Sequence, residues 1–212
     1  MSIYLGVFTF FLACFTSLFS VVNPISAMPV FLALTTGDSE KVRNRQAIKA
    51  SIYMIGILVT FFLAGTYIMN FFGISLEGIR IAGGLMIMRA SYSLLNPNEG
   101  GRKLTDEDEA EAMNKPDISF SPLAMPLLSG PGSIAVVLGF ASTISEFYQY
   151  AMILLAIVVT AFFAWVILRV APMGVKFLGK SGMTAMTRMM GFLGLTIGVQ
   201  FIINGVIPLL RG

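Results

Sequence analysis

Two short segments of helix-breaking and polar residues interrupt apolar parts of this 212-residue chain. Residues 23–26 have the sequence NPIS, and residues 130–133, which begin 107 positions later, have the sequence GPGS. Proline removes a backbone donor and clashes with the preceding turn, and inside a membrane no water satisfies the groups that it frees. Two such breaks at matching places in two halves indicate the binding site of a transporter.

The chemistry of these breaks favours a small zwitterion. A helix that restarts at Ser26 or Ser133 would direct unsatisfied backbone N–H groups and its positive dipole end into the protein, where they attract a carboxylate. Carbonyl groups just before each break attract an ammonium group, and glycines let a solute approach the backbone. The substrate-binding candidates are Asn23, Pro24, Ser26, Ser129, Gly130, Pro131, Gly132 and Ser133.

Four further polar residues are candidates for lining or gating a cavity: Arg89, Asn96, Gln200 and Asn204. Intramembrane ions are functional candidates by default, but the Arg89 side chain can also snorkel to the nearby interface. The three amide side chains have a structural alternative as well, because polar side chains in spans often bond neighbouring helices. Both interpretations remain open for each of them.

Several kinds of chemistry lack the residues they need. The chain has no histidine, and none of its 11 acidic residues lies deep in an apolar stretch, so a buried proton relay has no obvious residue to use. Coupling to protons would need Glu77 at the margin of a span or a route through water and backbone, and Na⁺ is the other candidate coupling ion. With one cysteine, no Walker-type glycine loop and no nucleophile and base pair, we expect no metal site, no cofactor and no enzyme activity.

Composition places the elements that carry these residues in a membrane. Hydrophobic residues make up 56% of the chain and charged residues only 12%, against roughly 25% charged residues in a soluble domain. We expect an all-α integral membrane protein, and we expect the first stretch to remain in the mature protein because no Lys or Arg precedes it. The six predicted spans are at about residues 3–35, 50–72, 79–95, 118–144, 150–171 and 189–210.

The distribution of Lys and Arg predicts the orientation of these spans. The first, third and fifth loops carry 11 of them and the opposite side carries two, Arg80 and Arg211. By the positive-inside rule the basic loops are cytoplasmic and both termini lie outside. The basic residues therefore serve topology rather than nucleic-acid binding.

A second repeated pattern predicts that the chain consists of two inverted halves. Arg80, Gly83, Leu85 and Asn96 match Arg188, Gly191, Leu193 and Asn204 at an offset of 108. Three spans per half is an odd number, so the halves, residues 1–96 and 118–212, would insert upside down relative to each other around a cytoplasmic acidic linker at 97–117. Chance similarity among apolar segments is the alternative.

Five stretches of the sequence form recognisable motifs: NPISAMPVF at 23–31, FGIS at 72–75, RIAGG at 80–84, PLAMPLLSGPGS at 122–133 and RMMGFLGLTIGVQFI at 188–202. In these stretches the chain resembles the MarC family of bacterial and archaeal inner-membrane proteins. The resemblance implies six spans with both termini periplasmic in a Gram-negative host, and a relation to carriers of small neutral amino acids such as glycine and alanine.

These observations lead to two hypotheses of different classes. The preferred one is a secondary transporter of glycine, alanine or serine that works by alternating access across the inner membrane, with spans 1 and 4 broken at the site. The alternative is a non-transporting membrane assembly or stress factor whose broken helices permit tight packing. The expected partners are a small zwitterionic solute and the lipid bilayer, and the oligomeric state is left open.

Overall fold

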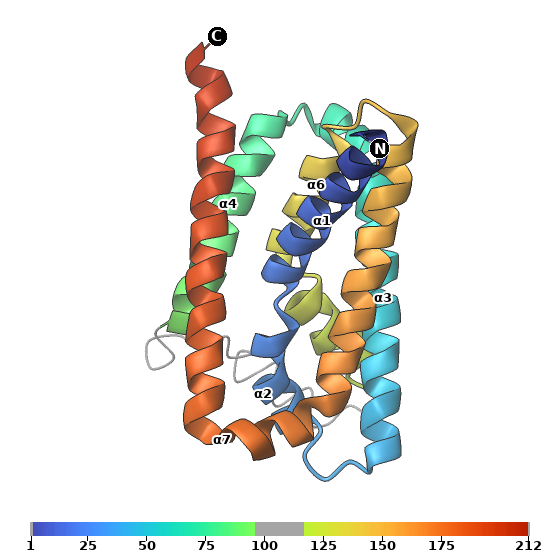
Figure 1. Cartoon of the computed structure of the whole chain (residues 1–212), viewed down its shortest axis with the longest axis vertical. Coiled ribbons are helices and arrows are strands. Elements are labelled where there is room, and N and C mark those ends of the chain that lie inside the picture. The colour runs from blue at the N-terminus through green and yellow to red at the C-terminus, as the bar shows by residue number, and fades with distance from the viewer. Residues whose placement is uncertain (1, 96–116, 212) are drawn as a thin grey trace.

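The computed structural model of the chain describes residues 2–95 and 117–211, which form helices and no strand. The predicted acidic linker, apart from Asp117, lies outside the described residues, as does Asn96. Apart from η1, which has the wide turns of a π-helix, the elements are α-helices (Figure 1). They are α1 (Ser2–Val22), α2 (Pro24–Leu34), α3 (Glu40–Phe72), α4 (Leu76–Leu95), η1 (Ser119–Leu128), α6 (Pro131–Ala141) and α7 (Phe147–Arg211).

Four to five of these segments are long and apolar enough to cross a membrane, counting only the described residues. The four are Leu5–Leu34, Glu40–Phe72, Phe147–Gly174 and Ser181–Leu210, and the fifth is η1 together with α6. The all-α membrane class is confirmed. The predicted third span, α4, is not among these segments; its 20 residues include Glu77, Arg80 and Arg89. The six-span inverted repeat therefore stays a prediction.

The long helix α7 consists of two legs that run in opposite directions (Figure 1). The legs are joined where Gly179 adopts φ 63° and ψ −179°, a conformation open to glycine and strained for other residues. The segment predicted as the fifth loop is therefore helical on both sides of this corner.

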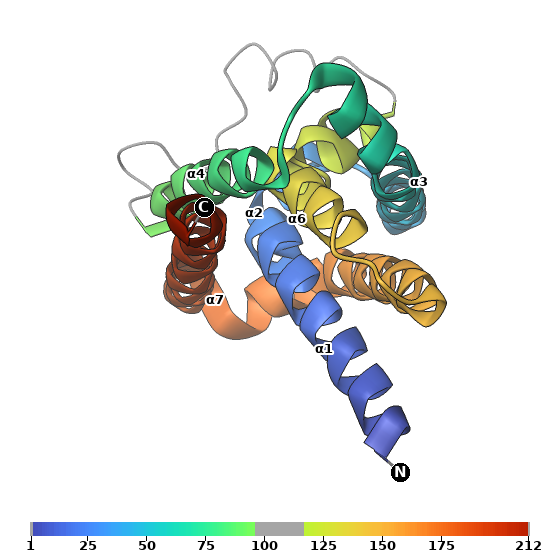
Figure 2. The same ribbon diagram turned by 90° about the horizontal axis from the view of Figure 1, so that it is seen from above.

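The broken spans lie between two flanking pairs of helices (Figures 1 and 2). The first leg of α7 lies near α3, and the second leg lies beside α4. The core between them includes Leu18, Phe31, Leu128 and Val136, which are fully buried. Large apolar side chains such as Leu5 and Phe8 are exposed on the outside of the bundle, where a bilayer would cover them.

Helices α4 and α7 pack with their backbones in direct contact along a row of glycines, which we call the glycine seam. A Cβ atom placed on Gly84 would lie 2.6 Å from the carbonyl oxygen of Gly198, and one on Gly205 would lie 2.9 Å from that of Glu77. Gly191 is equally close to Ser91, at 3.0 Å from its carbonyl oxygen. Glycines commonly permit such close approach of helices in membrane proteins.

Helix α3 begins at Glu40, about ten residues before the predicted second span, because Ser39 caps its N-terminus. The Ser39 side chain accepts a hydrogen bond from the Val42 N–H at 3.4 Å, as serine commonly does at this position. Basic residues that the sequence assigned to the first loop, including Lys49, thus lie on the first turns of α3.

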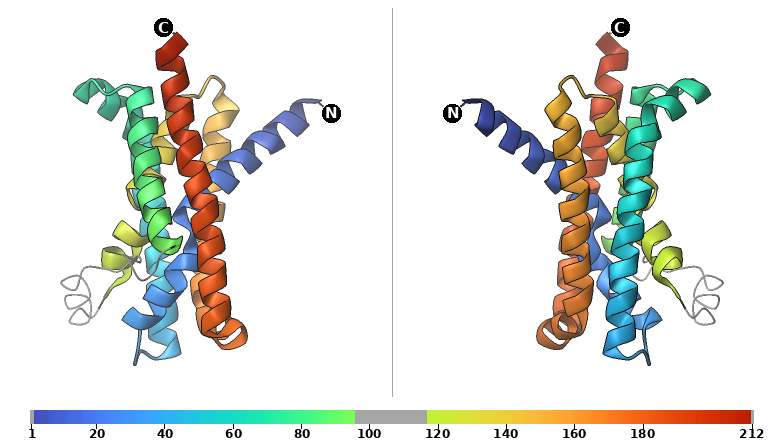
Figure 3. Two further views of the ribbon diagram at one scale, coloured as in Figure 1. Left: turned by 90° about the vertical axis from the view of Figure 1, so that its left-hand side faces the viewer. Right: turned by 90° about the vertical axis from the view of Figure 1, so that its right-hand side faces the viewer.

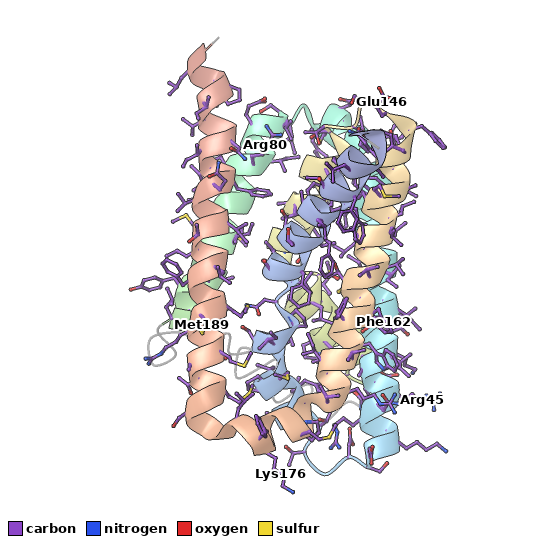
Figure 4. The ribbon with its side chains drawn as sticks, viewed as in Figure 1. Arg45, Arg80, Glu146, Phe162, Lys176 and Met189 are labelled. Atoms are coloured by element: carbon purple, nitrogen blue, oxygen red, sulfur yellow. The ribbon has the colours of Figure 1, made fainter. Side chains whose placement is uncertain are left out.

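The two termini lie at the same end of the bundle (Figures 1 and 3). Figure 4 shows Arg80 and Glu146 near that end, while Arg45 and Lys176 lie near the opposite end. This separation agrees with the segregation of Lys and Arg in the sequence. Which end faces the cytoplasm stays a prediction.

Candidate functional site

The first break is a single residue, Asn23, between α1 and α2. Asn23 adopts the left-handed conformation with φ 47° and ψ 63°, which asparagine tolerates better than most residues. Its Oδ1 accepts a hydrogen bond from the Ser26 N–H at 3.3 Å, and its own N–H donates to the Phe19 carbonyl at 2.9 Å. Pro24 then occupies the first helical position of α2, where its missing N–H costs nothing.

The second break lies between η1 and α6, which meet at an angle of 64°. Within η1, Ser121 and Met125 have extended φ/ψ angles, as expected for residues that precede proline. The Ser129 N–H closes the last wide turn by donating to the Ala124 carbonyl at 2.8 Å. The fourth predicted span is therefore not a regular α-helix where it contains Pro122 and Pro126. The sequence predicts a break in this span.

Helix α6 begins with an open N-terminus. Its N-cap is Gly130, which has no side chain to accept a hydrogen bond, and Pro131 follows at the first position. The N–H groups of Gly132 and Ser133 belong to the first turn of α6, and the N–H groups of a first turn find no carbonyl acceptor within their own helix. The first break differs, because Asn23 already satisfies one such group. Both helices restart two residues earlier than the predicted Ser26 and Ser133.

The two breaks lie next to each other in the interior. A Cβ atom placed on Gly132 would lie 3.2 Å from Cγ1 of Val21, two residues before Asn23, and 2.9 Å from Cγ1 of Ile87. Helix α2 also contacts η1. Figure 1 shows both breaks at about mid-height in the bundle. The structure thus brings together the two segments that the sequence singled out.

Two serine hydroxyls at the breaks are buried without a partner. Ser26 is 3% exposed and Ser129 is 0% exposed, and their Oγ atoms have no hydrogen-bond partner among the described residues. In contrast, Oγ of Ser133 donates to the Leu128 carbonyl at 3.2 Å. A buried hydroxyl without a partner costs about 1–3 kcal/mol. A buried polar group without a partner calls for an explanation, and a bound solute or water is one.

The glycines of the second break serve packing. A Cβ atom on Gly130 would lie 2.8 Å from the carbonyl oxygen of Pro126. A Cβ atom on Gly132 would meet the side chains of Ile87 and Val21. The missing side chains therefore let η1, α1 and α4 approach α6, and the role of these glycines in binding a solute stays a prediction.

A cavity of about 290 Å³ extends beside the halves of the broken spans that lie nearer the termini. Gly139 lies in its wall: this residue is buried, yet a Cβ atom placed on it would meet no atom within 4 Å. The cavity is lined by Phe10, Ala13, Cys14 and Ser17 of α1, Arg80 of α4, Val136, Gly139 and Phe140 of α6, Thr143 of the turn after α6, and Phe201 and Asn204 of α7.

One wall of this cavity carries a short chain of polar contacts. Nη1 of Arg80 donates to the main-chain carbonyl of Asn204 at 3.4 Å, and Nε2 of Gln200 donates to Oδ1 of Asn204 at 2.8 Å. Asn204 thus lines the cavity and Gln200 supports it from the next turn. Arg89 is exposed and lies outside the cavities described here.

The sequence-based candidates did not include Arg80, Ser17 or Thr143. The available signal was helical spacing, since the lining positions 10, 13, 14 and 17 on α1 recur at intervals of three and four. Positions 136, 139 and 140 on α6, with 143 just after it, have the same spacing. This spacing identifies one face of each helix, but only the structure shows that the two faces meet.

The chain segment that enters η1 is anchored on α3 away from the breaks. Oε1 of Gln46 accepts from the Ile118 N–H at 3.3 Å, and its Nε2 donates to Oδ2 of Asp38 at 3.1 Å. Asp117 forms a salt bridge with Lys49. The hydrogen bonds from Lys49 and Ser119 lower the pKa of Asp117 from 3.8 to about 2.

Comparison with known proteins identifies the family. The model of the MarC family, described as "MarC family integral membrane protein", matches residues 8–210. The inner membrane protein MarC of Citrobacter koseri is 36% identical over 204 residues, covering 92% of each chain. The protein of the same name from Escherichia coli K12 is 35% identical over 207 residues, also covering 92% of each chain. No solved structure matches this chain. The chain therefore belongs to the MarC family of integral membrane proteins.

Proposed function

We propose that this protein is a secondary transporter of small neutral amino acids, of the glycine, alanine and serine class, in the inner membrane. The solute binds where the two broken spans meet. Two inverted halves of three spans each, residues 1–96 and 118–212, rock around it, with both termini periplasmic. The proposal assigns no catalytic chemistry to the chain, and a proton or Na⁺ is the candidate coupling ion.

The observation that carries the proposal is the pair of buried hydroxyls, Ser26 and Ser129, without partners at adjacent breaks. Next to them, the N-terminus of α6 has no side-chain cap. Its N–H groups and helix dipole favour a carboxylate. Serine oxygens and the last carbonyls of α1 are acceptors for an ammonium group. Both charges of a small amino acid thus have complementary groups, without any ionisable side chain.

The name of the relatives supports the membrane assignment but says nothing of a solute. Relatives in Escherichia coli and Citrobacter koseri are called inner membrane proteins. The choice of an amino acid as the solute rests on the polar groups at the breaks and on the family resemblance.

One observation favours the alternative of a membrane assembly or stress factor that moves no solute. The Cβ directions of Gly130 and Gly132 are filled by protein atoms, so these glycines permit close packing of the broken helices. In that case the breaks would serve the shape of the bundle alone.

Counterflow in reconstituted vesicles separates the two functions. Vesicles loaded with unlabelled alanine should accumulate labelled alanine or glycine saturably. Lactate, which lacks the ammonium group, and ethylamine, which lacks the carboxylate, should compete poorly, because the site needs both charges. Absence of counterflow by the folded wild-type protein, for glycine, alanine and serine alike, would contradict the proposal.

A pair of variants tests the location of the site. Ser129→Leu fills the space at the second break and should abolish counterflow. Ser51→Leu is the matched control, because Ser51 is also a buried serine without a partner but lies in an apolar groove between α3 and α7. Equal activity of both variants, at equal thermal stability, would place the site elsewhere.

A further inference from the structure

We propose that the cavity lined by Arg80 is an access site, in which the Arg80 guanidinium binds the carboxylate of the solute before the solute reaches the breaks. We call it the Arg80 cavity. This inference rests on the proposed transport function and adds a second binding position, its charge and its ligand group.

The Arg80 cavity lies on the same helices as the breaks. Ser17 in its wall is six residues before Asn23, and Val136 is five residues after Pro131. At 1.5 Å per residue, these separations correspond to about 9 Å and about 8 Å along the helix axes. The cavity is therefore one to two turns from each break, on the side of the termini (Figure 4 shows Arg80 at that end).

Arg80 is the one ionisable side chain besides Cys14 among the lining residues. Within residues 2–95 and 117–211 it forms no ion pair, and its one hydrogen bond goes to the Asn204 carbonyl. A guanidinium has five N–H donors in a fork that matches a carboxylate. Most of these donors are thus uncommitted beside a cavity with mainly apolar walls, where a charge acts more strongly than in water.

The cavity also offers an acceptor for the ammonium group of an amino acid. Oγ1 of Thr143 donates to the Gly139 and Phe140 carbonyls, at 3.3 Å and 3.1 Å. Its hydrogen is used in these contacts, so its lone pairs are free to accept. A volume of about 290 Å³ is at the small end of ligand pockets. These features favour a small amino acid over a larger anion.

The first test measures the charge of the cavity without transport. Cys14 is the single cysteine of the chain, so Ser17→Cys in a Cys14→Ala background gives one reactive thiol in the wall and leaves Thr143 intact. The measured quantity is the ratio of two labelling rates, that of a negatively charged methanethiosulfonate over that of a positively charged one. This ratio should be higher for the thiol in the cavity than for an exposed control thiol. Arg80→Gln should reduce this ratio about tenfold, and Arg80→Lys should largely retain it. A ratio unaffected by Arg80→Gln would overturn the proposal.

The second test identifies the source of the carboxylate. Alanine should slow labelling of the same thiol in nanodiscs of neutral phosphatidylcholine, whereas alaninamide, which lacks the carboxylate, should not. Protection by phosphatidylglycerol in the absence of alanine, with no further effect of alanine, would assign Arg80 to a lipid phosphate and overturn the proposal.

The third test links the cavity to flux. Arg80→Gln should raise the KM for alanine about tenfold and change the maximal rate little, since the breaks themselves are intact. Gly139→Leu should block flux by filling the cavity, while Gly56→Leu is the matched control, because a Cβ atom on either glycine meets no atom within 4 Å.

An unchanged KM in Arg80→Gln with active wild type would overturn the access site and leave the proposed function standing. Protection by alanine without any flux would support the site and contradict transport.

Discussion

Replacing Ser26 or Ser129 by alanine should stabilise the empty protein and weaken the binding of its solute. Both hydroxyls are buried without a hydrogen-bond partner among the described residues. Leaving such a group unsatisfied costs about 1–3 kcal/mol, and alanine also has the higher helix propensity, which helps at Ser26 in α2. A gain of about 1 kcal/mol corresponds to a rise in Tm of roughly 2–4 °C for a chain of about this size.

The effect on binding has the opposite sign. A hydrogen bond to a charged group contributes about 1.5–3 kcal/mol. Its loss would weaken the affinity for alanine about 10-fold to about 150-fold. The assay is thermal unfolding of the purified protein with and without alanine, together with equilibrium binding of labelled alanine. Each single variant should show a higher Tm without alanine and a smaller rise when alanine is added.

Two serine controls define what would refute this reasoning. Ser51→Ala removes another buried hydroxyl without a partner, in the groove between α3 and α7, and should raise the Tm without changing the affinity. Ser133→Ala removes the hydrogen bond to the Leu128 carbonyl and should lower the Tm by a few degrees. If Ser26→Ala and Ser129→Ala behave like Ser51→Ala in both assays, these hydroxyls do not bind the solute.

Three further predictions concern stability. Asn23→Ala should lower the free energy of unfolding by about 1–3 kcal/mol, since it removes the cap on the Ser26 N–H and places alanine in a left-handed conformation. Asn23→Gly should lower this free energy less, because glycine adopts the conformation without strain. Chemical denaturation measures both values. The pKa of Asp117 is lowered to about 2 by Lys49, so its contribution is present above about pH 4 and is lost as the pH falls towards 2; Asp117→Asn should flatten the Tm profile in that window. Gly84→Val should destabilise the protein by more than about 2 kcal/mol, because its Cβ would lie 2.6 Å from the Gly198 carbonyl oxygen, which cannot yield.

Each of these has a contrary outcome. Equal stability of the alanine and glycine variants at position 23 would exclude backbone strain as a factor there. A Tm profile between pH 4 and pH 2 that is the same with and without the Asp117 carboxylate would refute the assigned cause. Wild-type stability of Gly84→Val, beside Gly56→Val as a control, would contradict the close contact of α4 and α7.

The places of the two breaks could be predicted because proline acts locally. Pro24 and Pro131 cannot donate to the preceding turn, and both occupy the first position of a new helix. The sequence also contains a signal for the early start of α3, since Ser39 followed by Glu40 is typical of a helix start. The first turns of α3 were nevertheless predicted as a loop, because they carry several charged residues.

Other features depend on contacts between distant segments. The sequence does not show that Asn23 satisfies the Ser26 N–H, while the start of α6 stays uncapped. Nor does it show that Ser17, Arg80, Thr143 and Asn204 meet around one cavity, because they come from three helices and the turn after a fourth, whose relative rotation is set by packing. Helical periodicity predicts which residues share a face, but not which faces meet.

Because of the glycine seam, we expect α4 and the second leg of α7 to move together as one unit. Main-chain atoms of the two helices are in contact at Gly84, Gly191 and Gly205, so sliding one helix past the other would drive backbone into backbone. Spin labels at matching heights on this pair should therefore keep one sharp distance distribution whatever solute is present. The pair then supplies a fixed spectroscopic reference, against which displacements of α2 or η1 can be measured one at a time.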